Sequence, residues 1–186
     1  MMKKLLTISA LFLTICFASF ADGMVFCDSA ISPFVRTSKY YTYNVPEWEN
    51  YPTLNGTTSV MFSLPHPDPF YFYLGFGSSI NTCEYGFPSI GFTLNSAVSY
   101  SFHENSWPCC EILLLTRGGC GITFIKFIDF YMFADVTPYF TLMPAKDKSG
   151  LFFGIGPQVE YLQEVNWELY NQLSFGVSAI VGFRWR

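Results

Sequence analysis

The clearest candidate for catalytic chemistry is a short polar run in the middle of the chain, His103–Glu104–Asn105–Ser106. A histidine beside an acid or a hydroxyl could act as a general base or activate a nucleophile. The run has little support elsewhere, because the only other histidine is His66 and no HExxH, GxSxG, P-loop or Cys–His zinc spacing occurs. We therefore expect no enzyme activity, no cofactor and no metal site.

A second group of polar residues could form an ion-pair network inside the fold. The candidates are Asp129, Asp135, Glu160, Arg184 and Arg186. Members of the same segment are separated by an even number of positions, so in a β-strand their side chains would lie on the same face. Buried charges must be paired, so we expect these residues to form stabilising salt bridges. A polar path for a small solute is the alternative.

The cysteines form a third candidate set, as partners in disulfides. Five of the six cysteines follow residue 21, namely Cys27, Cys83, Cys109, Cys110 and Cys120. A bridge between Cys27 and Cys109 or Cys110 is one plausible pairing, since all three are expected at one end of the fold. Cys83 and Cys120 are expected at the other end, too far away to bond across. Free thiols in a reducing niche are the alternative.

The composition limits the kinds of fold that could position these residues. The 186 residues are 51% hydrophobic, 20% aromatic and only 13% charged, with a net charge of −4. Such a chain has enough apolar surface to fold, which excludes disorder. The negative charge argues against nucleic acid as a partner. No repeat or linker divides the chain after residue 21, so we expect one domain over residues 22–186.

Residues 1–21 have the pattern of a secretory signal peptide. Lys3 and Lys4 precede an apolar run from Leu5 to Cys16, and small residues precede a cleavage point before Asp22. Leu13–Thr14–Ile15–Cys16 weakly matches a lipobox, which would make Cys16 a lipid anchor. The sequence therefore predicts export.

Period-2 alternation is the main structural signal in the rest of the chain, and it predicts β-strands. In Ser89–Phe102 the even positions are apolar, except Ser96, and the odd positions are Ser, Gly, Thr, Asn and Ala. Leu173–Arg186 repeats the pattern, with Ile180 the only apolar residue on the polar face. No run reaches the length of a membrane-spanning helix.

The nature of the two faces favours a membrane barrel. The outer face of a soluble sandwich is usually rich in charges, whereas the polar face here is mostly Gly, Ser, Thr and Asn. Small residues suit the crowded interior of a narrow barrel, and bulky aromatics suit a face turned to lipid. A secreted soluble β-sandwich stapled by disulfides remains the alternative.

In this alternation the chain resembles the small outer-membrane β-barrels of diderm bacteria. The C-terminal strand, Leu173–Arg186, carries the resemblance best, although Trp185 is penultimate where the family usually ends in an aromatic. The resemblance implies an all-β, closed, antiparallel up-and-down transmembrane barrel in the outer membrane. It also implies contact with outer-membrane lipid, and recognition of the last strand by the barrel-assembly machinery.

Eight strands are expected, with ten as the alternative. The segments we assign are Ile31–Tyr43, Thr57–Leu64, Phe70–Ile80, Ser89–Phe102, an ambiguous Glu111–Met143, Leu151–Leu162 and Leu173–Arg186. Gly118–Gly119–Cys120–Gly121 is a turn or a bulge. Outer loops are expected at Asn44–Gly56, Asn81–Pro88 and Gln163–Asn171. An interfacial aromatic belt near the strand ends is expected from Trp48, Trp107, Trp167, Trp185, Tyr40, Tyr41 and Tyr170, with ordinary core packing as the alternative.

The expected function follows from this architecture. An eight-stranded barrel is just wide enough for side chains to fill, so we expect a structural or surface-exposed outer-membrane protein rather than an open porin-like pore. A narrow channel or lateral route for small or hydrophobic solutes is the alternative. An external ligand or host surface is not identified by the loop composition.

Overall fold

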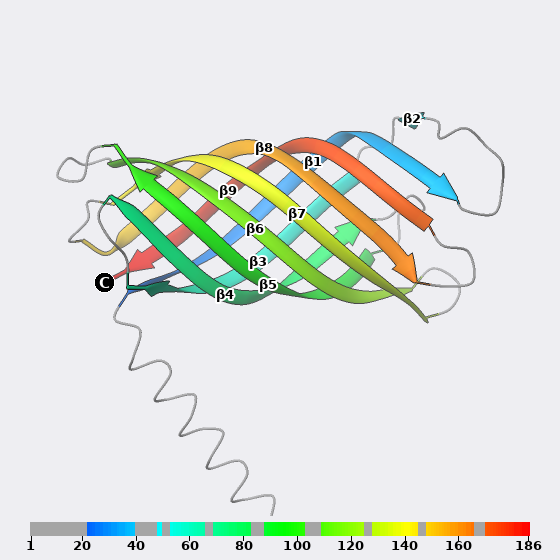
Figure 1. The fold of residues 1–186 in the computed structure, drawn as a ribbon, viewed down its shortest axis with the longest axis horizontal. Coiled ribbons are helices and arrows are strands. Elements are labelled where there is room, and N and C mark those ends of the chain that lie inside the picture. The colour runs from blue at the N-terminus through cyan, green and yellow to red at the C-terminus, as the bar shows by residue number, and fades with distance from the viewer. Residues whose placement is uncertain are drawn as a thin grey trace, which may run out of the picture.

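Long β-strands make up nearly all of the structure that is described. The computed structural model describes residues 22–39, 48–49, 53–65, 69–82, 88–102, 109–124, 128–144, 148–165 and 170–186. The strands are β1 (Gly23–Lys39), β2 (Trp48–Glu49), β3 (Thr53–Leu64), β4 (Phe70–Thr82), β5 (Pro88–Ser101), β6 (Cys109–Phe124), β7 (Ile128–Met143), β8 (Gly150–Val165) and β9 (Tyr170–Trp185) (Figure 1). Within the described residues, no helix is both long and apolar enough to cross a membrane.

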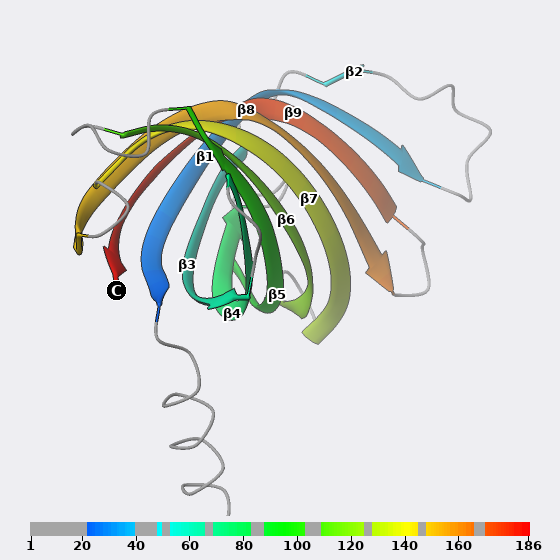
Figure 2. The same ribbon diagram turned by 60° about the vertical axis from the view of Figure 1, so that its left-hand side comes forward.

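Each strand pairs with the next strand of the chain, and the last pairs with the first. The order is β1-β3-β4-β5-β6-β7-β8-β9, all antiparallel, and β9 closes on β1 from Gly23↔Trp185 to Lys39↔Tyr170. The two-residue β2 adds only to the edge of β1. Figure 2 shows the strands curving round a common axis. The closed eight-stranded barrel is therefore confirmed.

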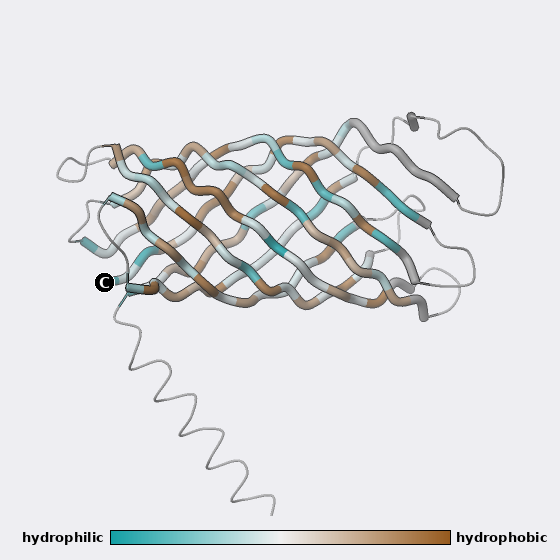
Figure 3. Tube along the Cα trace, viewed as in Figure 1, coloured by the Kyte–Doolittle hydropathy of each residue, from teal (hydrophilic) through white to brown (hydrophobic). Residues whose placement is uncertain are grey.

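The closed sheet has one inner and one outer surface, and the alternation assigns residues to each as expected. On β5 the odd positions Ser89 to Ser101 are buried, while Ile90, Phe92, Leu94 and Tyr100 are exposed. The hydropathy colour in Figure 3 therefore changes repeatedly along each strand of the barrel. No second layer of the described chain covers the exposed rows, so the two-sheet sandwich is wrong.

Glycines on the inner surface leave room for aromatic rings from the next strand. Gly91 of β5 pairs with Gly121 of β6, which pairs with Tyr131 of β7. A Cβ atom at either Gly91 or Gly121 would lie 2.5 Å from the Tyr131 hydroxyl. The Tyr131 ring can therefore lie against the inner surface of the wall only because Gly91 and Gly121 lack a side chain.

The ambiguous segment Glu111–Met143 contains two long strands, β6 and β7, which fixes the number of barrel strands at eight. The alternation was hidden because Ile112 and Leu114 face outward while Leu113 and Leu115 face inward. Gly118–Gly121 is neither turn nor bulge, because its pairing with Phe92, Phe133 and their neighbours is continuous. The small residues make room for rings in the interior.

Several strand boundaries differ from the expected ones, most of all at the starts of β1 and β3. β8 and β9 also extend into the expected outer loop Gln163–Asn171, since β8 ends at Val165 and β9 begins at Tyr170. β1 begins at Gly23 instead of Ile31, and β3 begins at Thr53, inside the expected outer loop Asn44–Gly56. The start of β1 lacked an apolar face because Cys27 and Ser29 point outward while Asp28 points inward. A buried charge in a strand is tolerated only with a partner, and that partner lies on a distant strand.

Several expectations fall outside the described residues. They are the signal peptide at residues 1–21, Cys16, Cys83, both histidines, Trp107, Trp167, Tyr40 and Tyr41. The side chains of Trp48 and Tyr170 are likewise outside the description. Of the expected aromatic belt, Trp185 alone can be assessed: it is half-buried, and its ring centroid lies 6.3 Å from that of Phe62.

Candidate functional site: the polar centre of the barrel

The barrel interior has a polar centre between two apolar clusters. The larger cluster begins at the end that carries the termini and includes Met24, Phe26, Met61, Leu113, Leu115, Met143 and Phe152. The smaller cluster, Tyr131, Phe133 and Leu162, lies toward the opposite end. Asp135 on β7 falls between Phe133 and Tyr139, so the charged residues occupy the height between the clusters.

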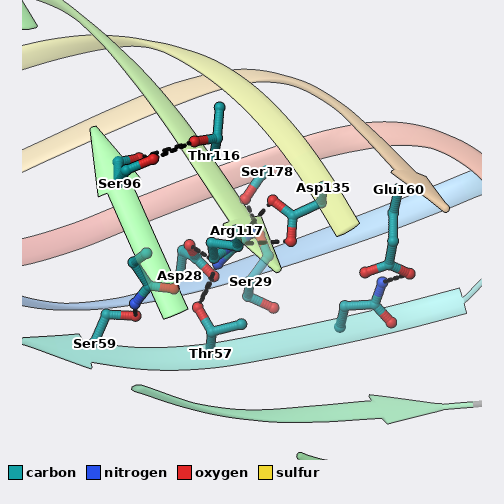
Figure 4. A network of polar contacts seen from close by, with 12 residues as sticks. Asp28, Ser29, Thr57, Ser59, Ser96, Thr116, Arg117, Asp135, Glu160 and Ser178 are labelled. Atoms are coloured by element: carbon teal, nitrogen blue, oxygen red, sulfur yellow. Dashed lines mark hydrogen bonds and ion pairs between the residues drawn. The ribbon is translucent and has the colours of Figure 1, made fainter. Parts of the chain in front are cut away.

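Arg117 of β6 is the central residue of the polar centre (Figure 4). Its Nε donates to both carboxylate oxygens of Asp135 at 2.9 Å. Its Nη1 forms an ion pair with Asp28 of β1, on another part of the wall. All three side chains are almost completely shielded from solvent. One guanidinium therefore joins β1 to β6 and β7 through the interior.

Hydroxyl groups complete the coordination of Asp28. Thr57 of β3 accepts a hydrogen bond from Arg117 and donates one to Asp28. The Tyr139 hydroxyl donates to Asp28 Oδ2 at 3.2 Å and lies 2.6 Å from the Ser178 hydroxyl of β9. These contacts compensate for the water that the ions lose on burial. The polar centre thus connects strands β1, β3, β6, β7 and β9.

Glu160 of β8 lies apart from this ion pair and has a neutral partner. Asn55 Nδ2 donates to Glu160 Oε1 at 2.8 Å, and both residues are buried. Asp135 is the register partner of Glu160 across the β7–β8 seam. No salt bridge to Glu160 occurs among the described residues, so hydrogen bonding to Asn55 is its main compensation.

A second ion pair lies inside the larger apolar cluster. Arg184 of β9 donates from Nη1 to Glu111 Oε1 of β6 at 2.9 Å and from Nη2 to the Pro144 carbonyl at 2.6 Å. Both side chains are almost completely buried. The pair links the closing strand β9 to β6 across the interior near the termini.

The expected ion-pair network is therefore split among separate contacts. Asp135, Glu160 and Arg184 face the interior, but no ion pair joins any two of these three described residues. Arg186 lies at the rim, where it is 3.6 Å from Asp22 and its guanidinium lies over the Tyr71 ring. Asp129 belongs to β7, opposite Thr123, with its side chain outside the description.

Three principal residues of these ion pairs were not in the candidate set: Asp28, Arg117 and Glu111. Asp28 precedes the segment expected as the first strand, and Arg117 borders the glycines interpreted as a turn. A signal was present nonetheless, because Glu111 and Arg117 share parity with each other along one segment. Continuing that parity through the glycines would have placed both in the interior.

The cysteines do not form the expected disulfide. Cys27, Cys109, Cys110 and Cys120 are all free thiols. Cys27 is exposed on the outer surface beside Thr58 of β3, whereas Cys109 is buried inside near Ser101 and Glu111. The expected pairing with Cys109 overlooked this alternation, which places the two thiols on opposite sides of the wall. Cys110 faces outward like Cys27, but it lies on β6, four strands away from β1 in the closed sheet.

The chemistry of the site is that of ion pairing. No group of three or more His, Cys, Asp or Glu among the described residues could hold a metal ion. Arg117 and Arg184 are each ion-paired with buried carboxylates, and apolar clusters lie on either side of the polar centre. Such an arrangement ties strands together from within.

Comparisons with known proteins found a similarity in structure. No protein-family model matches the chain, and no curated protein matches it. Among solved structures, the crystal structure of Neisserial surface protein A (NspA) superposes with a TM-score of 0.45 at 11% identity, covering 86% of this chain and 96% of that one. By its own strand pairing, the chain is a closed eight-stranded antiparallel β-barrel with buried ion pairs in its interior.

Proposed function

We propose that this chain is an integral outer-membrane β-barrel protein with a structural or surface-exposed role on a bacterial cell. The observation that carries the proposal is the set of large apolar side chains exposed on the outer surface. They include Phe70, Phe72, Leu74, Phe76, Ile80, Ile90, Phe92, Leu94, Phe130, Met132, Phe140, Leu151, Phe153, Ile155, Phe175, Val177, Val181 and Phe183. Soluble monomers do not expose so large a continuous apolar surface.

The height of this apolar band fits a bilayer. The exposed apolar residues run from Ile90 to Tyr100 on β5 and from Leu151 to Tyr161 on β8. At about 3.3 Å per residue each run covers about 33 Å, which a strand tilt of about 40° reduces to about 25 Å along the barrel axis. The apolar band of an outer-membrane barrel is about 25 Å tall.

Two pairs of polar side chains on the outer surface are hydrogen-bonded. The Ser96 and Thr116 hydroxyls are 2.6 Å apart on β5 and β6, and the Cys27 thiol lies 3.5 Å from the Thr58 hydroxyl. An unpaired polar group in hydrocarbon costs several kcal/mol. The pairing therefore supports a lipid environment for this surface.

Aromatic side chains gather at the termini end of the outer surface. Tyr100 contacts Phe70 and Phe102 with ring centroids 5.2 and 5.1 Å apart, and Phe62 contacts Trp185. Aromatic girdles mark the membrane interface of such barrels. We infer outer-membrane lipid as the surrounding partner, and the barrel-assembly machinery as the partner that recognises β9.

Extraction and heat modifiability test this proposal. The protein should stay with membranes in alkaline carbonate, and after detergent extraction its gel mobility should change on boiling. Release by carbonate or high salt would overturn the proposal. Conductance in a planar bilayer tests the alternative, a narrow channel for small solutes. We expect refolded protein to show no single-channel conductance, because buried side chains occupy the interior.

A further inference from the structure

The pairing between β7 and β8 is interrupted halfway along the barrel. Pairs run from Phe130↔Val165 to Val136↔Val159 and begin again at Phe140↔Ile155. The same register on both sides places Pro138 opposite Pro157. Proline has no backbone N–H, so neither residue can donate a hydrogen bond to the other strand. The seam therefore lacks its cross-strand bonds at this point.

The interruption is confined to this seam. Pro138 is paired with Leu114 of β6, and Pro157 with Val177 of β9, on the opposite edges of their strands. The β5–β6 ladder is continuous from Ser89↔Thr123 to Ser101↔Glu111. The β1–β9 seam contains a bulge between Ile31 and Phe34, but pairing resumes at once. The two prolines thus create a local weak point in the wall.

The interior behind this weak point is the polar centre. Thr137 and Tyr139 of β7 and Gln158 of β8 face inward there and are buried. Among the described residues, Thr137 Oγ1 and Gln158 Oε1 have no hydrogen-bond partner. Gly156, on the inner surface of β8 beside Pro157, has no side chain that could cover the seam from within.

A molecule that entered from either end of the barrel would have to pass an apolar cluster to reach the polar centre. The larger apolar cluster, with Met24, Leu113 and Phe152, separates the polar centre from the termini end. Tyr131, Phe133 and Leu162 lie toward the other end. Pro138 and Pro157 are both exposed on the outer surface, so the interrupted seam lies between the polar centre and the surroundings of the barrel.

We propose that the wall opens at the β7–β8 seam and admits small uncharged molecules from the bilayer to the polar centre. Thr137 and Gln158 supply free hydrogen-bonding atoms to a molecule that enters. Between Val136↔Val159 and Phe140↔Ile155, separation of the two strands breaks fewer cross-strand bonds than over an equal length of a continuous ladder. The proposal rests on the membrane location proposed above.

Thiol labelling in lipid vesicles tests the opening. All native cysteines are first replaced by serine, and then Thr137→Cys and Thr93→Cys are made separately. Thr93 is the matched control, because it is also completely buried, also lacks a hydroxyl partner and lies behind continuous ladders. We expect uncharged N-ethylmaleimide to label the Thr137→Cys protein at least about tenfold faster, which corresponds to about 1.4 kcal/mol. A charged methanethiosulfonate should label neither quickly.

Restoring the missing N–H groups should close the route. Adding Pro138→Ala and Pro157→Ala should slow maleimide labelling of the Thr137→Cys protein about tenfold or more, with little effect on the Thr93→Cys protein. Equal labelling of the two threonine positions, or no slowing by the alanines, would overturn the proposal. Carbonate resistance and heat-shifted mobility are measured on every variant, so loss of membrane insertion is recognised separately.

Discussion

At the scale of single residues, Arg117 is the most consequential side chain in the interior. It is shared between Asp28 and Asp135, which come from different parts of the wall. Buried ion pairs are not strongly stabilising compared with well-packed apolar residues, but removal of one partner leaves uncompensated charge. The structure therefore depends on Arg117 more than its net energetic contribution suggests.

Replacement of Arg117 by methionine should destabilise the folded barrel by about 3–5 kcal/mol, because two carboxylates lose their common cation. Urea unfolding in lipid vesicles, followed by gel mobility, measures the change. Glu160→Gln is the matched control, since a glutamine oxygen can still accept the hydrogen bond from Asn55. Equal losses for the two variants would contradict the assigned difference between the ion pair and the amide contact.

The lipid-facing residues can be tested by the depth dependence of an added charge. Leu94→Arg, in the middle of β5, should lower the unfolding free energy by about 2–4 kcal/mol. For Phe102→Arg, at the end that carries the termini, the added charge should lower it by about 0–1 kcal/mol. Both positions are exposed, so a soluble protein would tolerate both. Unfolding free energies in vesicles provide the comparison, and a similar small effect at both sites would argue against the membrane location.

At the scale of the elements, contacts between neighbouring strands depend on glycines, which have no side chain, as much as on the large side chains beside them. Tyr131 of β7 lies against Gly91 and Gly121 on the two preceding strands. Larger residues at these positions would push the ring out of the wall. Narrow barrels alternate small and large side chains in this way because the interior tapers and must be filled.

Gly91→Ala should therefore destabilise the barrel by about 1–3 kcal/mol, the usual cost of overpacking. Much of that loss should disappear when Tyr131→Phe removes the hydroxyl that the new Cβ would meet. A double-mutant cycle in vesicles measures the coupling between the two positions. Strict additivity would show that the two side chains do not meet as described.

At the scale of the whole molecule, the apolar band and the length of the strands define how the barrel fits a bilayer. The band is about 25 Å tall by the strand geometry, and the strands end in aromatic residues near the termini. A mismatch between such a band and the surrounding hydrocarbon costs fractions of a kcal/mol per Å. The barrel should therefore be most stable in thin bilayers.

Folding into vesicles of increasing acyl-chain length tests this fit. With saturated phosphatidylcholines from twelve to eighteen carbons, held above their melting temperatures, the unfolding free energy should decrease as the hydrocarbon becomes thicker than about 25 Å. The Leu94→Arg variant should be weaker than the parent at every thickness. Stability that does not vary with chain length would be inconsistent with a band matched to the bilayer.

The sequence alone was sufficient to establish the fold class and the orientation of most side chains. Alternation in Ser89–Phe102 and Leu173–Arg186 distinguished inner from outer residues, including Ile180 as an apolar residue on the inner face. This works because a strand has a period of two, so each side chain's surface follows from its parity. The strand that contains Leu113 and Leu115 could not be recognised in this way, because apolar residues on both of its surfaces leave no alternation to detect.

The tertiary structure alone decided which interior residues meet. Asp28 and Arg117 are far apart in the chain, and nothing in either segment specifies the other. Their contact depends on closure of β9 onto β1, which brings opposite parts of one sheet to face each other across a narrow interior. The opposition of Pro138 and Pro157 likewise depends on register. Parity gives the surface on which a residue lies, whereas barrel closure and register give its neighbours.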